Sequence, residues 1–386
     1  MTNIISFMDK KITAVIPTYN RCPFAGKDTR FNPLWWAANS LFQETQVGEI
    51  IFIDDCSSDN IEETIAKIDE SKPSGTSVVY ARNEERKGSG ISRNLGVNLA
   101  SNEQIFFYDD DCIFASPDIL SDLKHAFDEY KKRDPATSAM TLPVSGNSLG
   151  PRLYPSNLIG KVDRNTGVFH GCYSKYPLEY ARDGFRAHVL HEREEILEPL
   201  EVELMGGVFL CDKSAFQKVG GFSNTPWRNA CAEEPELMLE IQRQGGKIFY
   251  LPSMDRSFRV IHLRYGDSSF SRSIDYQKFS LGGISLKEIV RASSVENRNN
   301  HGNRVEKHDE IYSNIISNTR LLFKYRDIFG EETGFNHLRT RFFENVEYGQ
   351  LNTFRAAVRD GIELMLTERI IDNSLANKIR LELLKD

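Results

Sequence analysis

The sequence lacks the features that would assign it to a membrane, to nucleic acid or to an oxidising compartment. No apolar run approaches the roughly 18 residues that a bilayer-spanning helix needs, and the first residues show no signal-peptide pattern. A net charge of −7 leaves no basic footprint for nucleic acid. Six cysteines are scattered without any C-x-x-C pair, which is typical of free thiols in a reducing compartment. We therefore expect a cytoplasmic protein that touches a membrane at most peripherally, on its inner face.

The length and composition are those of a globular chain with a large core. The 386 residues are 40% hydrophobic and 27% charged, and such a length predicts about two to three domains. Strand-like and glycine-rich patterns occupy residues 1–265, and helical patterns occupy residues 266–386. We predict an α/β domain followed by a helical C-terminal subdomain. Residues 141–200 show little periodicity and resemble an insertion that lines a substrate site, and a purely structural excursion is an equally good interpretation.

Three consecutive aspartates follow an apolar run near the middle of the α/β half. Residues 105–108 (IFFY) predict a buried parallel strand covered on both faces. Asp109, Asp110 and Asp111 then fall at its carboxyl end, where open α/β sheets bind ligands. Because adjacent carboxylates repel one another, the run indicates a divalent cation or a ring of donors. A solvated acidic turn is the alternative interpretation.

Polar loops also follow the earlier strands. Residues 11–17 predict a strand that opens into the loop TYNR, and residues 49–53 predict a strand that runs into Asp55. A doubly wound sheet begins its ligand site with such loops. Residues 88–90 (GSG) precede a helix, with Ser89 as its expected N-cap. Their glycines would let the backbone approach a ligand, although the spacing is that of neither a P-loop nor a dinucleotide site.

Two further features lie in the second half of the α/β region. Gly206 and Gly207 interrupt a strand predicted over residues 203–211, and a glycine pair in a strand indicates close approach of a ligand or of another backbone. Glu233 and Glu234 begin a predicted helix. Acidic residues are favourable in a first turn for electrostatic reasons alone, so a structural role is the alternative to catalysis.

Together these motifs resemble those of inverting family 2 glycosyltransferases. Seven segments match in family order between about residues 10 and 265, which makes the resemblance far more specific than one motif would. They are VIPTYNR (15–21), SLFQ with EIIFIDDCSSD (40–43 and 49–59), GSGISRNLG (88–96), FFYDDDCIF (106–114), GGVFLCDKSAFQKVGGF (206–222), EEPELMLEIQRQGGKIFYLP (233–252) and VIH (260–262). The resemblance implies a GT-A fold, which is a Rossmann-like mixed sheet flanked by helices.

The resemblance also implies a nucleotide-sugar donor, most often a UDP-sugar, bound with Mn²⁺ or Mg²⁺. Asp111 matches a direct metal ligand, and His262 matches the histidine that completes the metal site in some members. Carboxylates suit both ions, and manganese also accepts imidazole. A structural histidine at a strand edge is the alternative for His262. The positions expected to bind the donor are Pro17, Thr18, Tyr19, Arg21, Asp55, Arg93, Asp109, Asp110, Gly206, Gly207 and Arg264.

The pair Glu233 and Glu234 stands where the family more often has Glu-Asp. Glu234 is therefore the expected catalytic base, and Glu233 is the alternate because the extra methylene leaves the register open. Inversion needs only one carboxylate, which removes a proton from the acceptor hydroxyl as that hydroxyl attacks the anomeric carbon.

The expected function is transfer of a sugar to a saccharide, a lipid-linked glycan or a small natural product, with residues 141–200 on the acceptor side. The C-terminal helices would pack on the catalytic domain or on another subunit. A nucleotidyltransferase is one alternative, but it would carry a glycine-rich basic loop where this chain has PTYNR. A non-catalytic module that binds nucleotide sugars or glycans is another, and the presence of all the catalytic residue types disfavours it.

Overall fold

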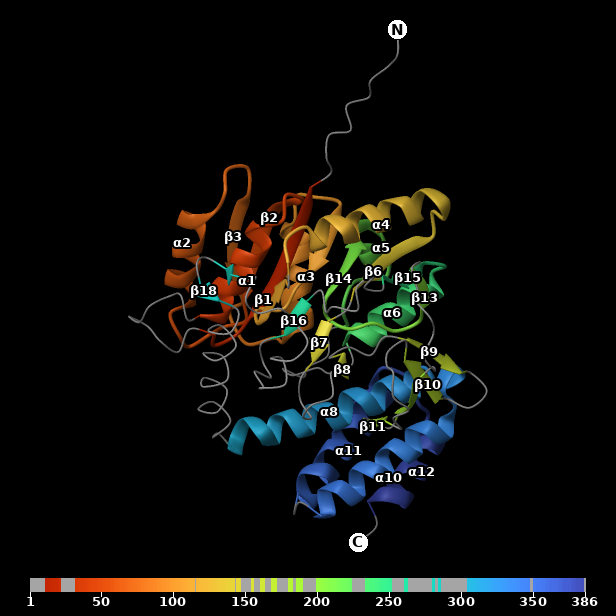
Figure 1. Cartoon of the computed structure of the whole chain (residues 1–386). Coiled ribbons are helices and arrows are strands. Elements are labelled where there is room, and N and C mark those ends of the chain that lie inside the picture. Colours follow the sequence, from red (N-terminus) through yellow and green to blue (C-terminus); the bar gives the residue numbers. More distant parts are fainter. Residues whose placement is uncertain are drawn as a thin grey trace.

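The computed structural model shows an α/β part followed by a group of C-terminal helices (Figure 1). It describes residues 11–21, 32–114, 116–142, 144–146, 154–155, 160–163, 168–171, 180–182, 185–189, 199–223, 233–251, 260–262, 280–281, 284–285, 304–347 and 350–384.

An eight-stranded mixed sheet forms the centre of the α/β part, in the order β13-β15-β6-β14-β4-β1-β2-β3. Its strands are β1 (Ile12–Thr18), β2 (Val47–Asp54), β3 (Ser77–Arg82), β4 (Gln104–Phe107), β6 (Thr137–Thr141), β13 (Leu200–Val202), β14 (Phe209–Asp212) and β15 (Lys247–Tyr250). Strand β4 is parallel to β1 but antiparallel to β14. The prediction of a parallel strand before the aspartates is thus right at one edge of β4 and wrong at the other.

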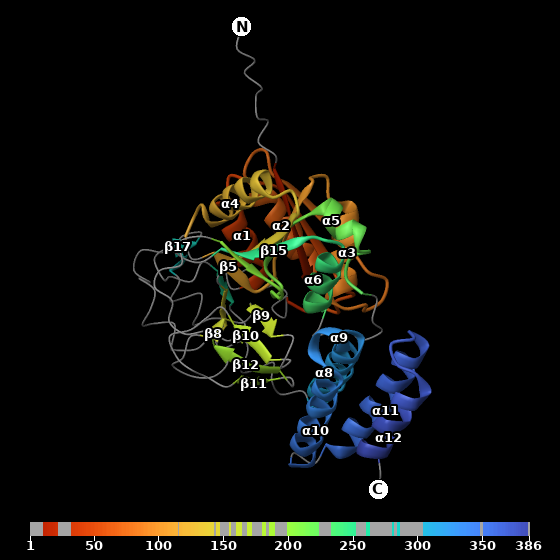
Figure 2. The ribbon, with the colours of Figure 1, turned by 90° about the vertical axis from the view of Figure 1, so that its right-hand side faces the viewer.

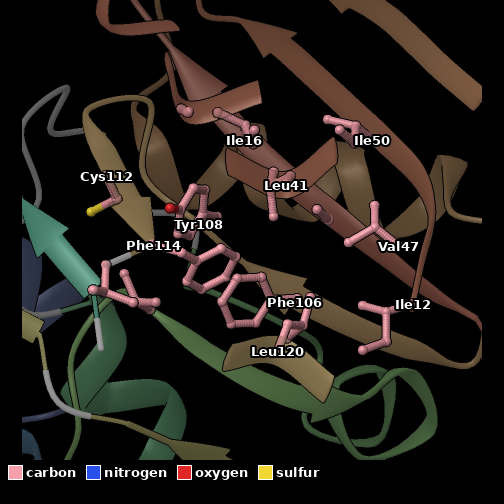
Figure 3. Close-up of a cluster of buried hydrophobic side chains, with 14 of the residues drawn as sticks. Ile12, Ile16, Leu41, Val47, Ile50, Phe106, Tyr108, Cys112, Phe114 and Leu120 are labelled. Atoms are coloured by element: carbon pink, nitrogen blue, oxygen red, sulfur yellow. The ribbon is translucent and has the colours of Figure 1, made fainter. Parts of the chain in front are cut away.

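Alternate residues of the central strands face two hydrophobic clusters on opposite sides of the sheet. Ile16 and Phe106 lie in one cluster with side chains of the helices on that face (Figure 3). Val15 and Phe107 lie in the other. Both faces are therefore covered, which explains the unbroken apolar runs in the sequence. The helices of the first face are α1 (Pro33–Phe42), α2 (Ile61–Ser71) and α4 (Ile119–Arg133), and those of the second are α3 (Ser89–Leu99), α5 (Lys213–Lys218) and α6 (Glu233–Arg243).

Helix α3 lies unusually close to β1. A Cβ atom added to Gly96 would lie 2.4 Å from Cγ1 of Val15, which is closer than two carbon atoms can approach. The glycine therefore permits this distance between helix and strand. Arg93 is on the same helix, so the contact also sets where its side chain lies relative to the sheet.

A smaller sheet continues from the aspartates, in the order β5-β16-β7-β8. Its register places His262 opposite Cys112. Its strands are β5 (Cys112–Phe114), β16 (Val260–His262), β7 (Val144–Gly146) and β8 (Tyr154–Pro155). Within the segment predicted as an insertion, a further four-stranded sheet consists of β9 (Gly160–Asp163), β10 (Val168–Gly171), β11 (Tyr180–Arg182) and β12 (Phe185–Val189). A two-stranded hairpin follows, formed by β17 (Ser280–Leu281) and β18 (Ile284–Ser285).

The C-terminal part is helical, as predicted. Its helices are α8 (Arg304–Lys324), α9 (Arg326–Phe329), α10 (Glu331–Glu347), α11 (Leu351–Thr367) and α12 (Asn373–Leu383). Helices α8, α10, α11 and α12 share a hydrophobic core of their own, with Phe323 and Phe354 completely buried. A second cluster joins them to the α/β part, because Leu321 packs with Leu204 and Leu239. None of the described helices is both long enough and apolar enough to span a bilayer.

Candidate functional site

The three aspartates lie between β4 and β5, at the carboxyl end of β4. Asp110 and Asp111 are buried, whereas the side chain of Asp109 is 28% exposed. Burial raises the pKa of the Asp110 carboxyl, and the nearby Arg21 guanidinium offsets only part of that effect. A run of acids that is buried to this degree is not a solvated acidic turn.

Arg21, in the loop after β1, neutralises two of the aspartates. Its Nε atom donates to both oxygens of Asp110 at 3.0 Å, and Nη2 donates to Oδ2 of Asp111 at 2.9 Å. Charge-assisted contacts of this kind are the stronger hydrogen bonds in proteins. The expected donor-binding arginine and the expected metal ligand are therefore in direct contact.

Arg93 on α3 joins Asp109 to the two glutamates at the start of α6. Its Nη2 donates to Oδ1 of Asp109 at 2.7 Å, and its Nη1 donates to Oε1 of Glu233 at 2.9 Å and of Glu234 at 3.0 Å. The Arg93 side chain is only 4% exposed. Although burial opposes it, the three carboxylates hold the pKa of Arg93 above its ordinary value, so the guanidinium stays charged. One cation thus faces three acids from two distant parts of the chain.

The two glutamates differ in their surroundings. The Glu233 side chain is 3% exposed, and that of Glu234 is 17% exposed. Burial, together with the neighbouring Glu234, raises the pKa of Glu233 to about 8. Burial also raises the pKa of Glu234, and Arg93 acts against that rise. Among the described residues no partner bonds to Oε2 of Glu233, which makes this atom the natural place for a proton.

Ser89 contributes to the cluster in a way that the sequence did not reveal. Gly88, with φ of 91°, occupies the N-cap of α3, so the predicted N-cap role of Ser89 is wrong. The Ser89 hydroxyl instead donates to Oε1 of Glu233. The sequence around Ser89 suggests an N-cap because it shows only neighbouring residues. The hydrogen-bond partner of Ser89, Glu233, lies 144 residues further along the chain.

The glycine pair lies in the loop before β14, because that strand begins at Phe209. The prediction of glycines inside a strand is therefore wrong. A Cβ atom on Gly207 would lie 3.2 Å from Nη2 of Arg93, 3.2 Å from Oε1 of Glu234 and 3.3 Å from Oδ2 of Asp109. The close approach that the glycines indicated is made to the carboxylate cluster, and a larger side chain would press on all three residues.

The remaining donor-binding candidates gather around the loop between β3 and α3. Asp55 accepts hydrogen bonds from Asn83 Nδ2 at 2.9 Å and from the backbone nitrogens of Lys87 at 2.7 Å and Gly88 at 2.8 Å. The Arg86 guanidinium lies 4.0 Å from the centre of the Tyr19 ring. Asp55 thus shapes this loop, against which Tyr19 also lies. Pro17 and Thr18 form the end of β1, where both are buried.

A divalent cation would find suitable oxygen donors at the end of β4. The Asp111 carboxylate already meets a positive charge there, from Arg21. The strand register places the His262 backbone beside Cys112, the residue after Asp111. The His262 side chain and Arg264 lie outside the described residues. Within the described ranges no group of three or more His, Cys, Asp or Glu side chains has a geometry that could hold a metal. The chemistry of the donors fits a hard cation, with Asp111 as the first candidate.

Residues 13–172 match the model of glycosyl transferase family 2. The match runs from β1 to β10 and ends before α6. The resemblance predicted from the motifs is confirmed for this part of the chain, and so is the GT-A class of α/β fold. This part of the chain is thus similar to a family 2 glycosyltransferase domain, and glycosyl transfer is the activity that this similarity supports. No curated protein matches the chain at a significant level.

Solved structures of glycosyltransferases show a distant likeness. The crystal structure of GalNAc-T7 with UDP, GalNAc and Mn²⁺ gives a TM-score of 0.44 at 19% identity over 74% of this chain, which spans 48% of that protein. The structure of S. aureus TarS 1-349 gives a TM-score of 0.43 at 13% identity, and the match covers 90% of each chain. The structure of TarS 1-349 in complex with UDP-GlcNAc gives a TM-score of 0.43 at 12% identity, and the match again covers 90% of each chain.

Proposed function

We propose that the protein transfers a sugar from a nucleotide-sugar donor, most often a UDP-sugar in this family, to an acceptor hydroxyl with inversion at the anomeric carbon. The observation that carries the proposal is the cluster in which Arg93 holds Asp109 beside Glu233 and Glu234. It brings the end of β4, inside the matched family domain, next to a pair of carboxylates outside it.

Glu234 is the proposed catalytic base. It is the more exposed of the two glutamates, so an acceptor can reach it. Glu233, with a pKa of about 8, carries a proton at neutral pH and is a poor base there. Glu234 takes the proton of the acceptor hydroxyl while the acceptor oxygen bonds to the anomeric carbon. The bond from that carbon to the diphosphate breaks on the opposite face, and the nucleoside diphosphate leaves.

The proposal includes a divalent cation, Mn²⁺ or Mg²⁺, with Asp111 as a ligand and His262 as a second. When bound, the cation would offset the charge that gathers on the departing diphosphate. Asp110 and Arg21 would lie beside it, and Pro17, Thr18, Tyr19 and Asp55 would face the nucleoside. The acceptor would be a saccharide, a lipid-linked glycan or a small natural product.

A panel of nucleotide sugars tests the proposal directly. Thermal stabilisation and slow donor hydrolysis should both appear with one nucleotide in the presence of Mn²⁺, and excess chelator should abolish the hydrolysis. Binding without turnover of any donor, with acceptors of all three classes added, would favour a non-catalytic binding module. Release of pyrophosphate from a nucleoside triphosphate and a sugar phosphate would instead identify a nucleotidyltransferase.

A further inference from the structure

Helix α6, which carries both glutamates in its first turn, lies directly against α8 and α9 of the C-terminal helices (Figure 2). Glu236 accepts a hydrogen bond from Nη1 of Arg320 at 2.6 Å on one oxygen, and from Nζ of Lys324 at 2.6 Å on the other. One turn further along, Glu240 accepts a hydrogen bond from the Tyr325 hydroxyl at 2.6 Å. Successive turns of α6 are thus each bonded to α8 or to the residue that follows it.

This contact is buried, although it is made of charges. Glu236 is 4% exposed and Arg320 is 6% exposed. Burial opposes ionisation of Glu236, but Arg320 and Lys324 hold its pKa below the usual range, so the carboxylate is charged. Desolvation offsets much of the attraction in such a set, so its net contribution to stability is small. The set instead orients helix α6, because directional hydrogen bonds restrict the rotation of a helix and its position along its axis more strictly than apolar packing does.

Glu236 also connects to the residues around Arg93. The Ser223 hydroxyl donates to Oε2 of Glu236 at 2.8 Å, the same oxygen that Arg320 contacts. The preceding residue, Phe222, exchanges two backbone hydrogen bonds of 2.9 Å with the Asn94 side chain of α3. Its ring centre lies 5.5 Å from the Arg93 guanidinium. Glu236 thus connects α8 to the segment of Phe222 and Ser223, whose phenylalanine ring lies against Arg93.

We propose that Arg320 is a positioning residue for the reaction: through Glu236 it fixes helix α6, and with it the placement of Glu234 against Arg93 and Asp109. The inference rests on the proposed function, in which Glu234 is the base. Glu236 lies three residues after Glu233, on the same side of the helix, so a rotation at Glu236 carries the first turn with it. The C-terminal helices would then contribute to turnover and not to folding alone.

A double-mutant cycle of Arg320→Gln and Glu236→Gln tests the proposal. Each single change should lower kcat for donor turnover by about tenfold or more, since a displacement of about 1 Å at a reacting group can cost about 100-fold. The donor KM and the affinity for UDP, measured by calorimetry, should stay unchanged. The double variant should lose no more than the worse single variant, and Arg320→Lys should recover part of kcat. Should Arg320→Gln fail to fold, Lys324→Gln provides the same test with a smaller expected loss.

Phe354→Leu is the matched control, because it weakens the core of the C-terminal helices without touching α6. It should lower the melting temperature but leave kcat unchanged. If Arg320→Gln likewise lowers only the melting temperature, or if the two losses in kcat simply multiply, the positioning role is wrong.

Hydrogen exchange separates this inference from the proposed function. Amides of α6 should exchange about tenfold faster in Arg320→Gln than in the wild type, and Phe354→Leu should not produce this change. If the wild type turns over no donor, the proposed function fails, while the exchange rates still decide whether Arg320 fixes α6. Unchanged exchange of α6 in Arg320→Gln would overturn the inference.

Discussion

The two arginines of the site are held in opposite ways. The Arg93 side chain is 4% exposed and binds three carboxylates that come from the β4 end and from α6. The Arg21 side chain is 29% exposed and binds two neighbouring carboxylates of one loop. Removal of Arg93 would leave three acids from two elements, with Glu233 buried among them, without a counter-ion. Removal of Arg21 would leave two buried carboxylates of one loop, whose present counter-ion itself reaches solvent. We infer that Arg93 is a fixed part of the site and that Arg21 occupies a place that another cation can take.

The largest effect should come from removing the fixed arginine. Arg93→Met would leave Asp109, Glu233 and Glu234 without their cation, and loss of one partner from a buried ion pair typically costs about 3–5 kcal/mol. Urea denaturation should show a loss of this size in the free energy of unfolding. Lys67→Met, which breaks an exposed pair with Glu63, should cost less than about 0.5 kcal/mol. Equal losses in the two variants would show that the cluster does not depend on Arg93.

The protonation of Glu233 gives a second, smaller effect. Its pKa is about 8 in the folded protein, against the ordinary value of 4.5. The folded state therefore keeps a proton that the unfolded chain loses above pH 4.5, and stability falls as pH rises from about 4.5 to about 8. The slope from this group is at most about 1.4 kcal/mol per pH unit.

Glu233→Gln imitates the protonated form and should remove this part of the pH dependence. Melting temperatures at pH 6 and pH 8 should therefore differ less in the variant than in the wild type, with the variant gaining relative stability at pH 8. Parallel behaviour of the two proteins across this range would mean that Glu233 is ionised throughout.

Substitution of Arg21 should give the smallest effect. It should strengthen cation binding, whereas the other two substitutions change stability. Arg21→Gln removes the positive charge from Asp110 and Asp111, so the affinity for Mn²⁺ without donor should rise by about tenfold. Electron paramagnetic resonance of free Mn²⁺ measures this directly. Arg243→Gln removes the same charge from an exposed pair with Asp327, and it should change the affinity less. If Arg21→Gln weakens Mn²⁺ binding, Arg21 supports the cation rather than standing in its place.

The sequence predicted the parts of the site that depend on local pattern. The apolar strand before the aspartates, the glutamates at the start of α6 and the C-terminal helices each follow from a run of neighbouring residues. The partners of Arg93 could not be predicted in this way, because Glu233 is 140 residues away and only the fold brings them together. The same holds for the contact between Ser89 and Glu233.

Two errors have a clear physical origin. The run ELMGGVFLC reads as one strand because its apolar residues are continuous, yet the strand begins only at Phe209. Gly207 lies in the preceding loop, where a Cβ atom would come within 3.2–3.3 Å of the carboxylate cluster and would require those side chains to shift. Serine is a residue type favoured at N-caps, but α3 begins at Ser89 itself, and Gly88 with φ of 91° occupies the N-cap.

The role of Glu234 as the base is tested by comparing kcat of Glu234→Gln and Glu233→Gln with the same donor, acceptor and Mn²⁺ concentration. Both variants keep the size of the side chain, and UDP affinity serves as the check on folding. Glu234→Gln should lose about 100-fold or more in kcat, whereas Glu233→Gln should stay within about tenfold of the wild type. An inactive Glu233→Gln beside an active Glu234→Gln would assign the base to Glu233 and contradict the role of Glu234.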